Sequence, residues 1–157
     1  INQAEKYIYI ETPYLIIDNK MMVALSMASK RGVDVRILTP HIPDKWYAFA
    51  VTQSNYEELL EAGVSIYQYT PGFNHGKTFI VDDDYAVVGT INLDYRSLYL
   101  HFECGVWMFN TDSVWQVKNS TLEALKISKQ VTLEDIKNTP KIRKLGRAVF
   151  KIFAPLM

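Results

Sequence analysis

The 157-residue sequence contains very little cysteine, with Cys104 as the single example. One cysteine cannot form an internal disulfide, so we expect a reducing compartment and a thiol that packs as a small buried hydrophobe. The sequence also has no run of about 20 apolar residues, the length that spans a bilayer, and no secretory signal peptide. Because the chain begins at Ile1 and enters a strand pattern almost at once, we expect a fragment of a longer protein.

Acidic residues are absent beyond Asp135, although the chain as a whole carries 17 acidic and 17 basic residues. Six of the basic residues lie between Lys137 and Lys151, which leaves eleven basic against seventeen acidic residues in the preceding body. The body is therefore net acidic and the tail is net basic, an asymmetry that the neutral total conceals. A neutral-to-acidic body disfavours duplex nucleic acid, and we expect no nucleic-acid partner.

Alternating strand and helix patterns predict one α/β domain over residues 1–157. We expect strands at Lys6–Ile10, Val33–Leu38, Val64–Tyr69, Thr78–Val81, Tyr85–Val88 and Glu103–Phe109. We expect helices from Asp18 to Arg31, from Asp44 to Ala62 and from Val114 to about Lys129. This order favours a mixed β-sheet with helices on both faces and right-handed crossovers between parallel strands.

The tail, residues 132–157, has the pattern of a basic amphipathic helical segment. Thr132 and Asp135 resemble a capping box, and Lys141–Phe153 places an apolar stripe opposite basic residues. Two interpretations remain open at this point. The helix either binds an anionic membrane surface, or packs on its own domain with the stripe buried and the lysines toward water.

The stretch from Phe73 to Glu103 contains the residues with chemical potential. Successive side chains on a strand alternate between its faces, so we expect His75 and Lys77, two residues apart, to point the same way and to place an imidazole beside a cation. Thr90 and Asn92, also two apart, follow the next strand and can supply neutral hydrogen bonds. Charged and neutral donors that converge on one point are typical of a site for a phosphate oxyanion.

These residues resemble the phospholipase D superfamily, whose motif is H-x-K-x4-D followed by G-[ST]-x-N. His75, Lys77 and Asp82 fit the first part, and Gly89, Thr90 and Asn92 fit the second. Further stretches resemble the C-terminal catalytic half of bacterial cardiolipin synthases, and they are Ile10–Tyr14, Arg31–Val35, Tyr56–Gly63 and Asn92–Ser97.

The resemblance implies a role for each site residue. His75 is expected to act as general acid and base, and Lys77 and Asn92 are expected to bind the phosphate. Glu103 is expected to accept a hydrogen bond from the far nitrogen of His75, and Thr90 either assists at the phosphate or only packs. Asp82 belongs to the motif, but it lies five residues from Lys77 and so faces the other side of an unbroken strand.

The resemblance further implies a phosphatidyltransferase that joins two phosphatidylglycerols into cardiolipin through a phosphohistidine, without cofactor or metal. The alternatives are a phospholipase D or nuclease of the same superfamily, and a non-catalytic membrane-binding half domain when the chain is isolated. The expected partners are anionic phospholipid, a membrane surface, and a missing N-terminal half or a second copy. The expected location is the cytoplasmic face of a bacterial cell membrane.

Overall fold

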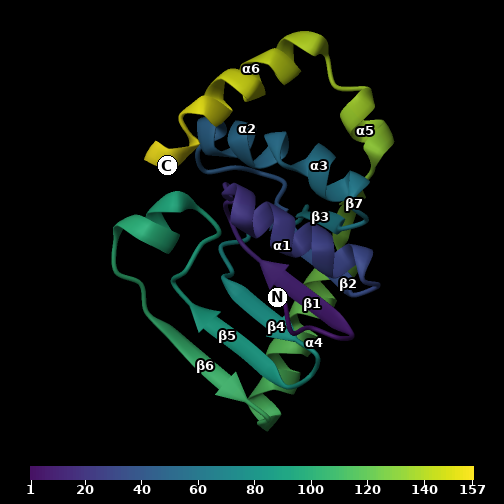
Figure 1. Ribbon diagram of the computed structural model, residues 1–157, viewed down its shortest axis with the longest axis vertical. Coiled ribbons are helices and arrows are strands. Elements are labelled where there is room, and N and C mark those ends of the chain that lie inside the picture. Colours follow the sequence, from purple (N-terminus) through teal and green to yellow (C-terminus); the bar gives the residue numbers. More distant parts are fainter.

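The computed structural model describes all 157 residues and has seven strands and six α-helices (Figure 1). The strands are β1 (Tyr7–Glu11), β2 (Asp34–Pro40), β3 (Ser65–Tyr69), β4 (Thr78–Val81), β5 (Tyr85–Gly89), β6 (Gly105–Phe109) and β7 (Ser128–Val131). The α-helices are α1 (Asn19–Lys30), α2 (Trp46–Ser54), α3 (Tyr56–Glu61), α4 (Asp112–Lys126), α5 (Leu133–Lys137) and α6 (Lys141–Ile152). A π-helical turn, η1 (Arg96–Leu100), and a 3-10 turn, η2 (Ala154–Leu156), complete the chain.

The strands form one mixed sheet in the order β6-β5-β4-β1-β2-β3-β7. The strands β1, β2 and β3 are parallel neighbours, and every other pair in the sheet is antiparallel. Helices cover both faces, with α4 on the face opposite α1 and α3 (Figure 1). The α/β class and the mixed sheet predicted from the pattern are confirmed.

The alternation of side chains along β1 divides the core between the two faces of the sheet. Ile8 and Ile10 belong to the main cluster of 18 buried residues, which α1 and α3 cover. Tyr7 and Tyr9 point the other way and pack in a smaller cluster with Val114 of α4. Because both faces of β1 are buried, the strand is held firmly in the core. It therefore fixes the positions of β2 and β4, which pair with it on either side.

Three sequence expectations differ from the structure. The long helix expected over 44–62 is interrupted at Asn55, whose side-chain amide donates to the carbonyl of Leu15 at 2.8 Å. The helix expected to reach Lys129 ends at Lys126, because the next residues pair with β3 as the edge strand β7. Cys104 is exposed rather than buried.

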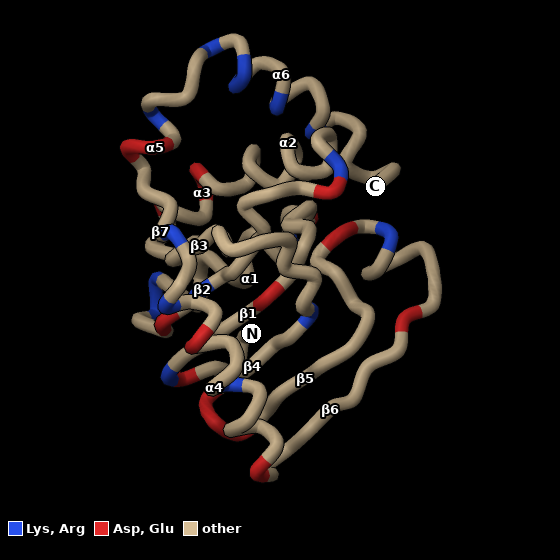
Figure 2. Tube along the Cα trace, turned by 180° about the vertical axis from the view of Figure 1, so that it is seen from behind, with Lys and Arg blue, Asp and Glu red and all other residues tan.

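The basic tail forms α5 and α6, and Thr132 makes the expected capping box with Asp135. Basic residues are distributed along α6 without an acidic one (Figure 2). The helix packs on α2, yet its apolar stripe is exposed, so the interpretation in which packing buries the stripe is wrong. No helix of the chain is long and apolar enough to cross a bilayer.

Candidate active site

His75 and Lys77 lie in the loop that precedes β4, beside the carboxyl end of β1. The strands β1 and β4 are antiparallel and pair Glu11 with Thr78, which makes these two ends neighbours. The exposed imidazole of His75 stacks on the ring of Phe73, with the ring centroids 5.4 Å apart. The ammonium of the half-buried Lys77 donates to the backbone carbonyl of His75 at 3.0 Å. The structure thus brings the predicted histidine and cation together on one loop.

The electrostatic environment lowers the pKa of both groups. Desolvation lowers the pKa of His75, the charge of Lys77 lowers it further, and Asp44 acts in the opposite direction. Desolvation also lowers the pKa of Lys77, while Glu103, Asp94 and Asp44 act to raise it. Because a free imidazole has a pKa of about 6.5, the side chain of His75 is mostly neutral at pH 7. A neutral imidazole has a lone pair that can attack an electrophile or accept a proton.

The buried carboxylate of Glu11 holds the loop that carries His75 and Lys77. Its side chain accepts hydrogen bonds from the hydroxyl of Thr121 at 2.5 Å and from the amide of Asn74 at 3.1 Å. The side-chain oxygen of Asn74 in turn accepts from the backbone amide of Gly76 at 2.7 Å. A Cβ atom at Gly76 would lie only 2.5 Å from Glu11 Oε2. Sequence reasoning did not identify Glu11, because its partners Asn74 and Thr121 lie far from it in the sequence.

Asn92 lies just beyond β5, near the same end of β4. The backbone amide of Gly89 donates to the carbonyl of Lys77 at 3.2 Å, which joins the end of β5 to the residue before β4. The next segment is fastened to the loop after β1, since the amide of Leu93 donates to the hydroxyl of Thr12 at 3.1 Å. The side-chain oxygen of Asn92 is buried without a hydrogen-bond partner. The unpaired atom is an acceptor, so only the side-chain nitrogen of Asn92 could donate a hydrogen bond to a phosphate oxygen.

In the structure Glu103 makes no hydrogen bond to His75, in contrast to the expected pairing. Its carboxylate accepts from the hydroxyl of Thr90 and lies 3.4 Å from Nδ1 of His101. The Ser97 hydroxyl and then the Thr90 hydroxyl lower the pKa of Glu103. Of these two hydroxyls, that of Thr90 donates a hydrogen bond to the carboxylate, whereas Ser97 Oγ is buried without a hydrogen-bond partner.

The strand register explains this difference. Glu103 precedes β6, which pairs with β5, so its nearest partners lie at the end of β5. His75 precedes β4, one strand further along the sheet. The hydroxyl of Thr90 is engaged locally, since it also accepts from the amide of Cys104 at 2.9 Å. Of the two neutral residues expected at the phosphate, Thr90 uses its hydroxyl within the connection between β5 and β6, where it bonds Glu103 and the backbone of Cys104.

Asp82 follows the last residue of β4, whereas His75 and Lys77 precede its first residue. Its carboxylate accepts three backbone hydrogen bonds from Glu5–Tyr7, at 2.7 to 2.8 Å. Desolvation acts to raise the pKa of Asp82, but these three amides together lower it. Asp82 is five residues beyond Lys77 along β4, which at about 3.3 Å per residue separates their backbones by roughly 16 Å. In this structure Asp82 therefore anchors the segment that leads into β1 and makes no hydrogen bond to the His75 loop.

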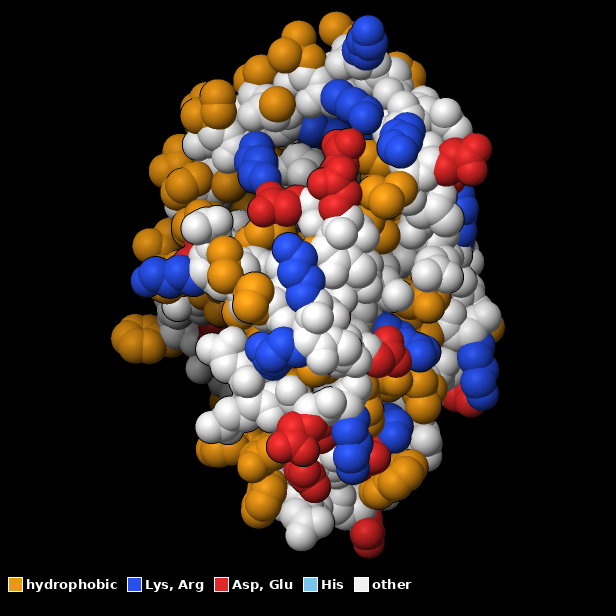
Figure 3. Space-filling view, turned by 45° about the vertical axis from the view of Figure 1, so that its right-hand side comes forward, with side chains coloured by type: hydrophobic (Ala, Val, Ile, Leu, Met, Phe, Trp, Pro, Cys, Tyr) orange, Lys and Arg blue, Asp and Glu red, His pale blue; other side chains and the backbone are white.

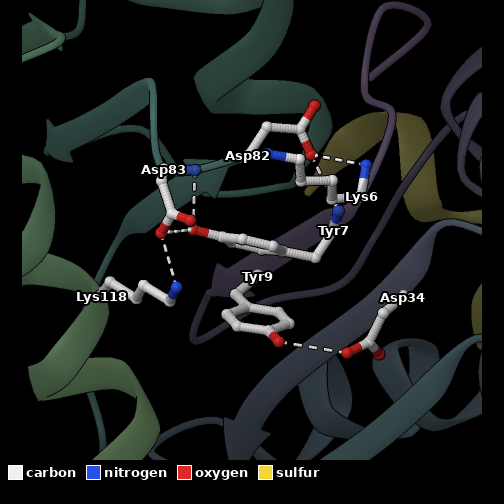
Figure 4. A network of polar contacts seen from close by, with 7 residues as sticks. All are labelled: Lys6, Tyr7, Tyr9, Asp34, Asp82, Asp83 and Lys118. Carbon is white, nitrogen blue, oxygen red and sulfur yellow. Dashed lines mark hydrogen bonds and ion pairs between the residues drawn. The ribbon is translucent and has the colours of Figure 1, made fainter.

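The neighbouring Asp83 fastens the same turn to the helix behind the sheet (Figure 4). Its carboxylate accepts from the hydroxyl of Tyr7 at 2.6 Å and from the ammonium of Lys118 in α4 at 2.5 Å. The same ammonium lies 4.6 Å from the centres of the Tyr7 and Trp115 rings. The acidic turn is thus a structural junction between β1, the β4–β5 hairpin and α4.

Comparisons with known proteins identify the family of this chain. A family model described as cardiolipin synthase, PLD-like domain, matches residues 1–124. The whole chain is 40% identical to a cardiolipin synthase of Alkalihalophilus pseudofirmus and spans 31% of that protein. The chain thus covers about a third of the length of the curated relatives it matches.

Two solved structures share the fold. Nuc, a phospholipase D family member from Salmonella typhimurium, has a TM-score of 0.72 at 20% identity, over 83% of this chain and 85% of Nuc. The phosphatidylserine synthase of Haemophilus influenzae has a TM-score of 0.75 at 19% identity, over 99% of this chain and 42% of that one. At such identities these structures show the fold alone. The sequence match to the family model decides the family, and the chain belongs to the cardiolipin synthase PLD-like domain family of the phospholipase D superfamily.

Proposed function

We propose that this chain is one catalytic half of a phosphatidyltransferase that joins two phosphatidylglycerols into cardiolipin and releases glycerol. The observation that carries the proposal is the loop on which the imidazole of His75 and the ammonium of Lys77 lie together, with Asn92 anchored near the same end of β4. The 40% identity to a cardiolipin synthase over the whole chain supports the choice of substrate.

The reaction takes two balanced steps. In the first, an imidazole nitrogen attacks the phosphorus of one phosphatidylglycerol, a phosphorus–nitrogen bond forms, and the bond to the glycerol oxygen breaks as that oxygen takes a proton from a second histidine. In the second step, a hydroxyl of another phosphatidylglycerol gives its proton to that second histidine, and its oxygen attacks the phosphorus of the phosphohistidine. A phosphorus–oxygen bond forms and the phosphorus–nitrogen bond breaks. Cardiolipin leaves, and both histidines return to their starting states.

We assign His75 the role of the second, proton-transferring histidine. Its lowered pKa suits the step in which it accepts a proton, and a bound anionic phosphate would raise that pKa toward the value needed to donate one. Lys77 would neutralise a non-bridging oxygen, and Asn92 would bind the same phosphate. The other two histidines have local partners, since His41 lies 3.0 Å from Gln68 and His101 lies 3.4 Å from Glu103.

The attacking histidine would therefore come from an N-terminal half of similar fold or from a second copy across a two-fold axis. The chain covers 31% of the length of two cardiolipin synthases that it matches. The remaining length of those proteins is enough for such a half. Apolar side chains near Glu103 are exposed, with Leu100 63% exposed and Phe102 fully exposed. The missing half or a second copy would cover them. Alone, the chain would be a non-catalytic half domain.

A phospholipase D or a nuclease would use the same phosphodiester chemistry with water as the acceptor. The net acidic body, residues 1–135, disfavours a nucleic-acid duplex as substrate. A phospholipid substrate places the complete enzyme at a membrane, and we propose the cytoplasmic face of a bacterial cell membrane.

The test is product analysis by mass spectrometry with phosphatidylglycerol vesicles, using the isolated chain and then a protein that contains both halves. We expect cardiolipin and glycerol from the two-half protein, and none from its His75→Ala variant at an unchanged melting temperature. Phosphatidic acid as the main product would favour the hydrolase instead. Robust turnover by a chain shown to be monomeric would refute the requirement for two histidines.

A further inference from the structure

The outer face of α6 presents an exposed apolar stripe. It consists of Ile142, Leu145, Val149 and Ile152, which are 75, 62, 48 and 74% exposed. Their spacing of three and four residues places them on one side of the helix. We call these four residues the α6 stripe. A helix that packs on its own domain normally buries such a stripe, so its exposure needs an explanation.

The opposite side of α6 attaches the helix to the domain. The ring of Phe150 packs edge-on against Trp46 of α2, with centroids 5.2 Å apart. The guanidinium of Arg147 donates to the side chain of Gln53 at 2.6 Å. Just after the helix, Ala154 is buried in a cluster with Val51 of α2. The helix cannot rotate to bury the α6 stripe without losing these contacts.

Basic side chains lie beside the α6 stripe. Lys141 and Lys151 are exposed, and Lys144 is half-buried, 3.8 Å from Glu57. No acidic residue occurs from Ile136 to the end of the chain. Figure 3 shows apolar side chains gathered along the upper margin of the molecule, where α6 lies, with basic side chains next to them. The surface therefore combines an apolar ridge with positive charge.

We propose that the α6 stripe inserts into the headgroup boundary of an anionic bilayer, with the flanking lysines against lipid phosphates. The chemistry favours lipid over a protein partner, because protein interfaces are depleted of lysine, whereas an anionic bilayer attracts it. The helix is also amphipathic without being long and apolar enough to span the bilayer, which suits a helix lying in the interface plane. This inference goes beyond the proposed reaction and does not depend on the chemistry at His75.

The test is co-sedimentation of the 157-residue chain with vesicles of phosphatidylcholine containing one third phosphatidylglycerol, at low and at high salt. Leu145→Ser with Ile152→Ser should weaken binding at least tenfold at both salt concentrations, because the inserted apolar groups are lost. Lys141→Gln with Lys151→Gln should weaken binding mainly at low salt, by about fivefold for each lysine near the surface. Vesicles of phosphatidylcholine alone should bind the unaltered chain weakly.

A matched control is available on α1, where Val23 and Met27 are half exposed and one turn apart. Val23→Ser with Met27→Ser removes similar apolar area from another helix and should leave vesicle binding unchanged. Thermal unfolding should show both serine pairs folded, since all four side chains are exposed. Vesicle binding undiminished by the Leu145 and Ile152 changes would overturn the proposal. The Leu145 and Ile152 changes could instead abolish self-association in size-exclusion chromatography and leave vesicle binding unchanged. That result would overturn the proposal and indicate that a second copy of the chain covers the α6 stripe.

Discussion

Replacing Gly76 by alanine tests whether Glu11 positions the catalytic loop. The new Cβ would lie 2.5 Å from Glu11 Oε2 and 3.0 Å from Asn74 Oδ1. Glu11 cannot easily move away, because it is buried and accepts from Thr121 at 2.5 Å. The loop that carries His75 must therefore shift.

The size of the effect follows from the contact. Overpacking of this kind costs about 1–3 kcal/mol, and for a chain of this length each kcal/mol lowers the melting temperature by about 2–4 °C. A displacement of His75 near 1 Å would lower the turnover of a two-half protein by roughly a hundredfold. Cardiolipin formation by mass spectrometry and thermal unfolding by circular dichroism measure the two effects.

Gly72→Ala is the matched control, since a Cβ at Gly72 meets no atom within 4 Å. It lies in the same connection between β3 and β4 and should change neither turnover nor melting temperature. The double variant Gly76→Ala with Glu11→Ala separates the clash between the new Cβ and the Glu11 side chain from a general loss of stability. If the contact matters, adding Glu11→Ala to Gly76→Ala should cost less than Glu11→Ala costs alone. Equal behaviour of Gly76→Ala and Gly72→Ala would refute the positioning role of Glu11.

Two further predictions concern charge. In an NMR titration, which has only three histidines to resolve, His75 should titrate below the ordinary pH of about 6.5, and Lys77→Met should raise its midpoint by removing a nearby positive charge. Glu103→Gln should leave that midpoint nearly unchanged; a clear fall would restore the expected pairing of Glu103 with His75. Asp82→Ala should lower the free energy of unfolding by about 1–3 kcal/mol at neutral pH, because three backbone amides lose their acceptor. The pKa of Asp82 is lowered in the folded chain, so this stabilisation is complete above the unfolded value of about 3.9 and is lost as the pH falls through the folded value. A large loss of turnover at an unchanged melting temperature would contradict this structural role.

Most of the fold could be predicted from the sequence because the local patterns agree with one another. The apolar strands, the cap at Asp18 and the glycine stops at Gly32 and Gly63 each mark an element boundary that the structure keeps within a few residues. The edge strand β7 was missed because Ser128–Val131 has little apolar content and forms a strand only by pairing with β3. Tertiary pairing overrode the local pattern at that position.

The candidate site could be predicted in part, since His75 and Lys77 are near in sequence and share one loop. The partners of Glu103 could not be predicted, because they depend on the register between β5 and β6 and on the π-helical turn before them. Glu11 was missed for a related reason. Its contacts with Asn74 and Thr121 cross 63 and 110 residues of sequence, and no local pattern reports such pairs.

The motif spacing from His75 to Asp82 is explained by the two ends of β4. At one end, β4 begins beside the carboxyl end of β1, where Glu11 supports the His75 loop. At the other end, Asp82 binds the backbone at Glu5–Tyr7 just as β1 begins. A strand fastened to β1 at both ends cannot slide, because a slip of one residue would break the Asp82 bonds and turn every side chain of β4 to the other face. We therefore expect the aspartate of the motif to influence the proposed chemistry from a distance, by fixing the register that places His75 and Lys77.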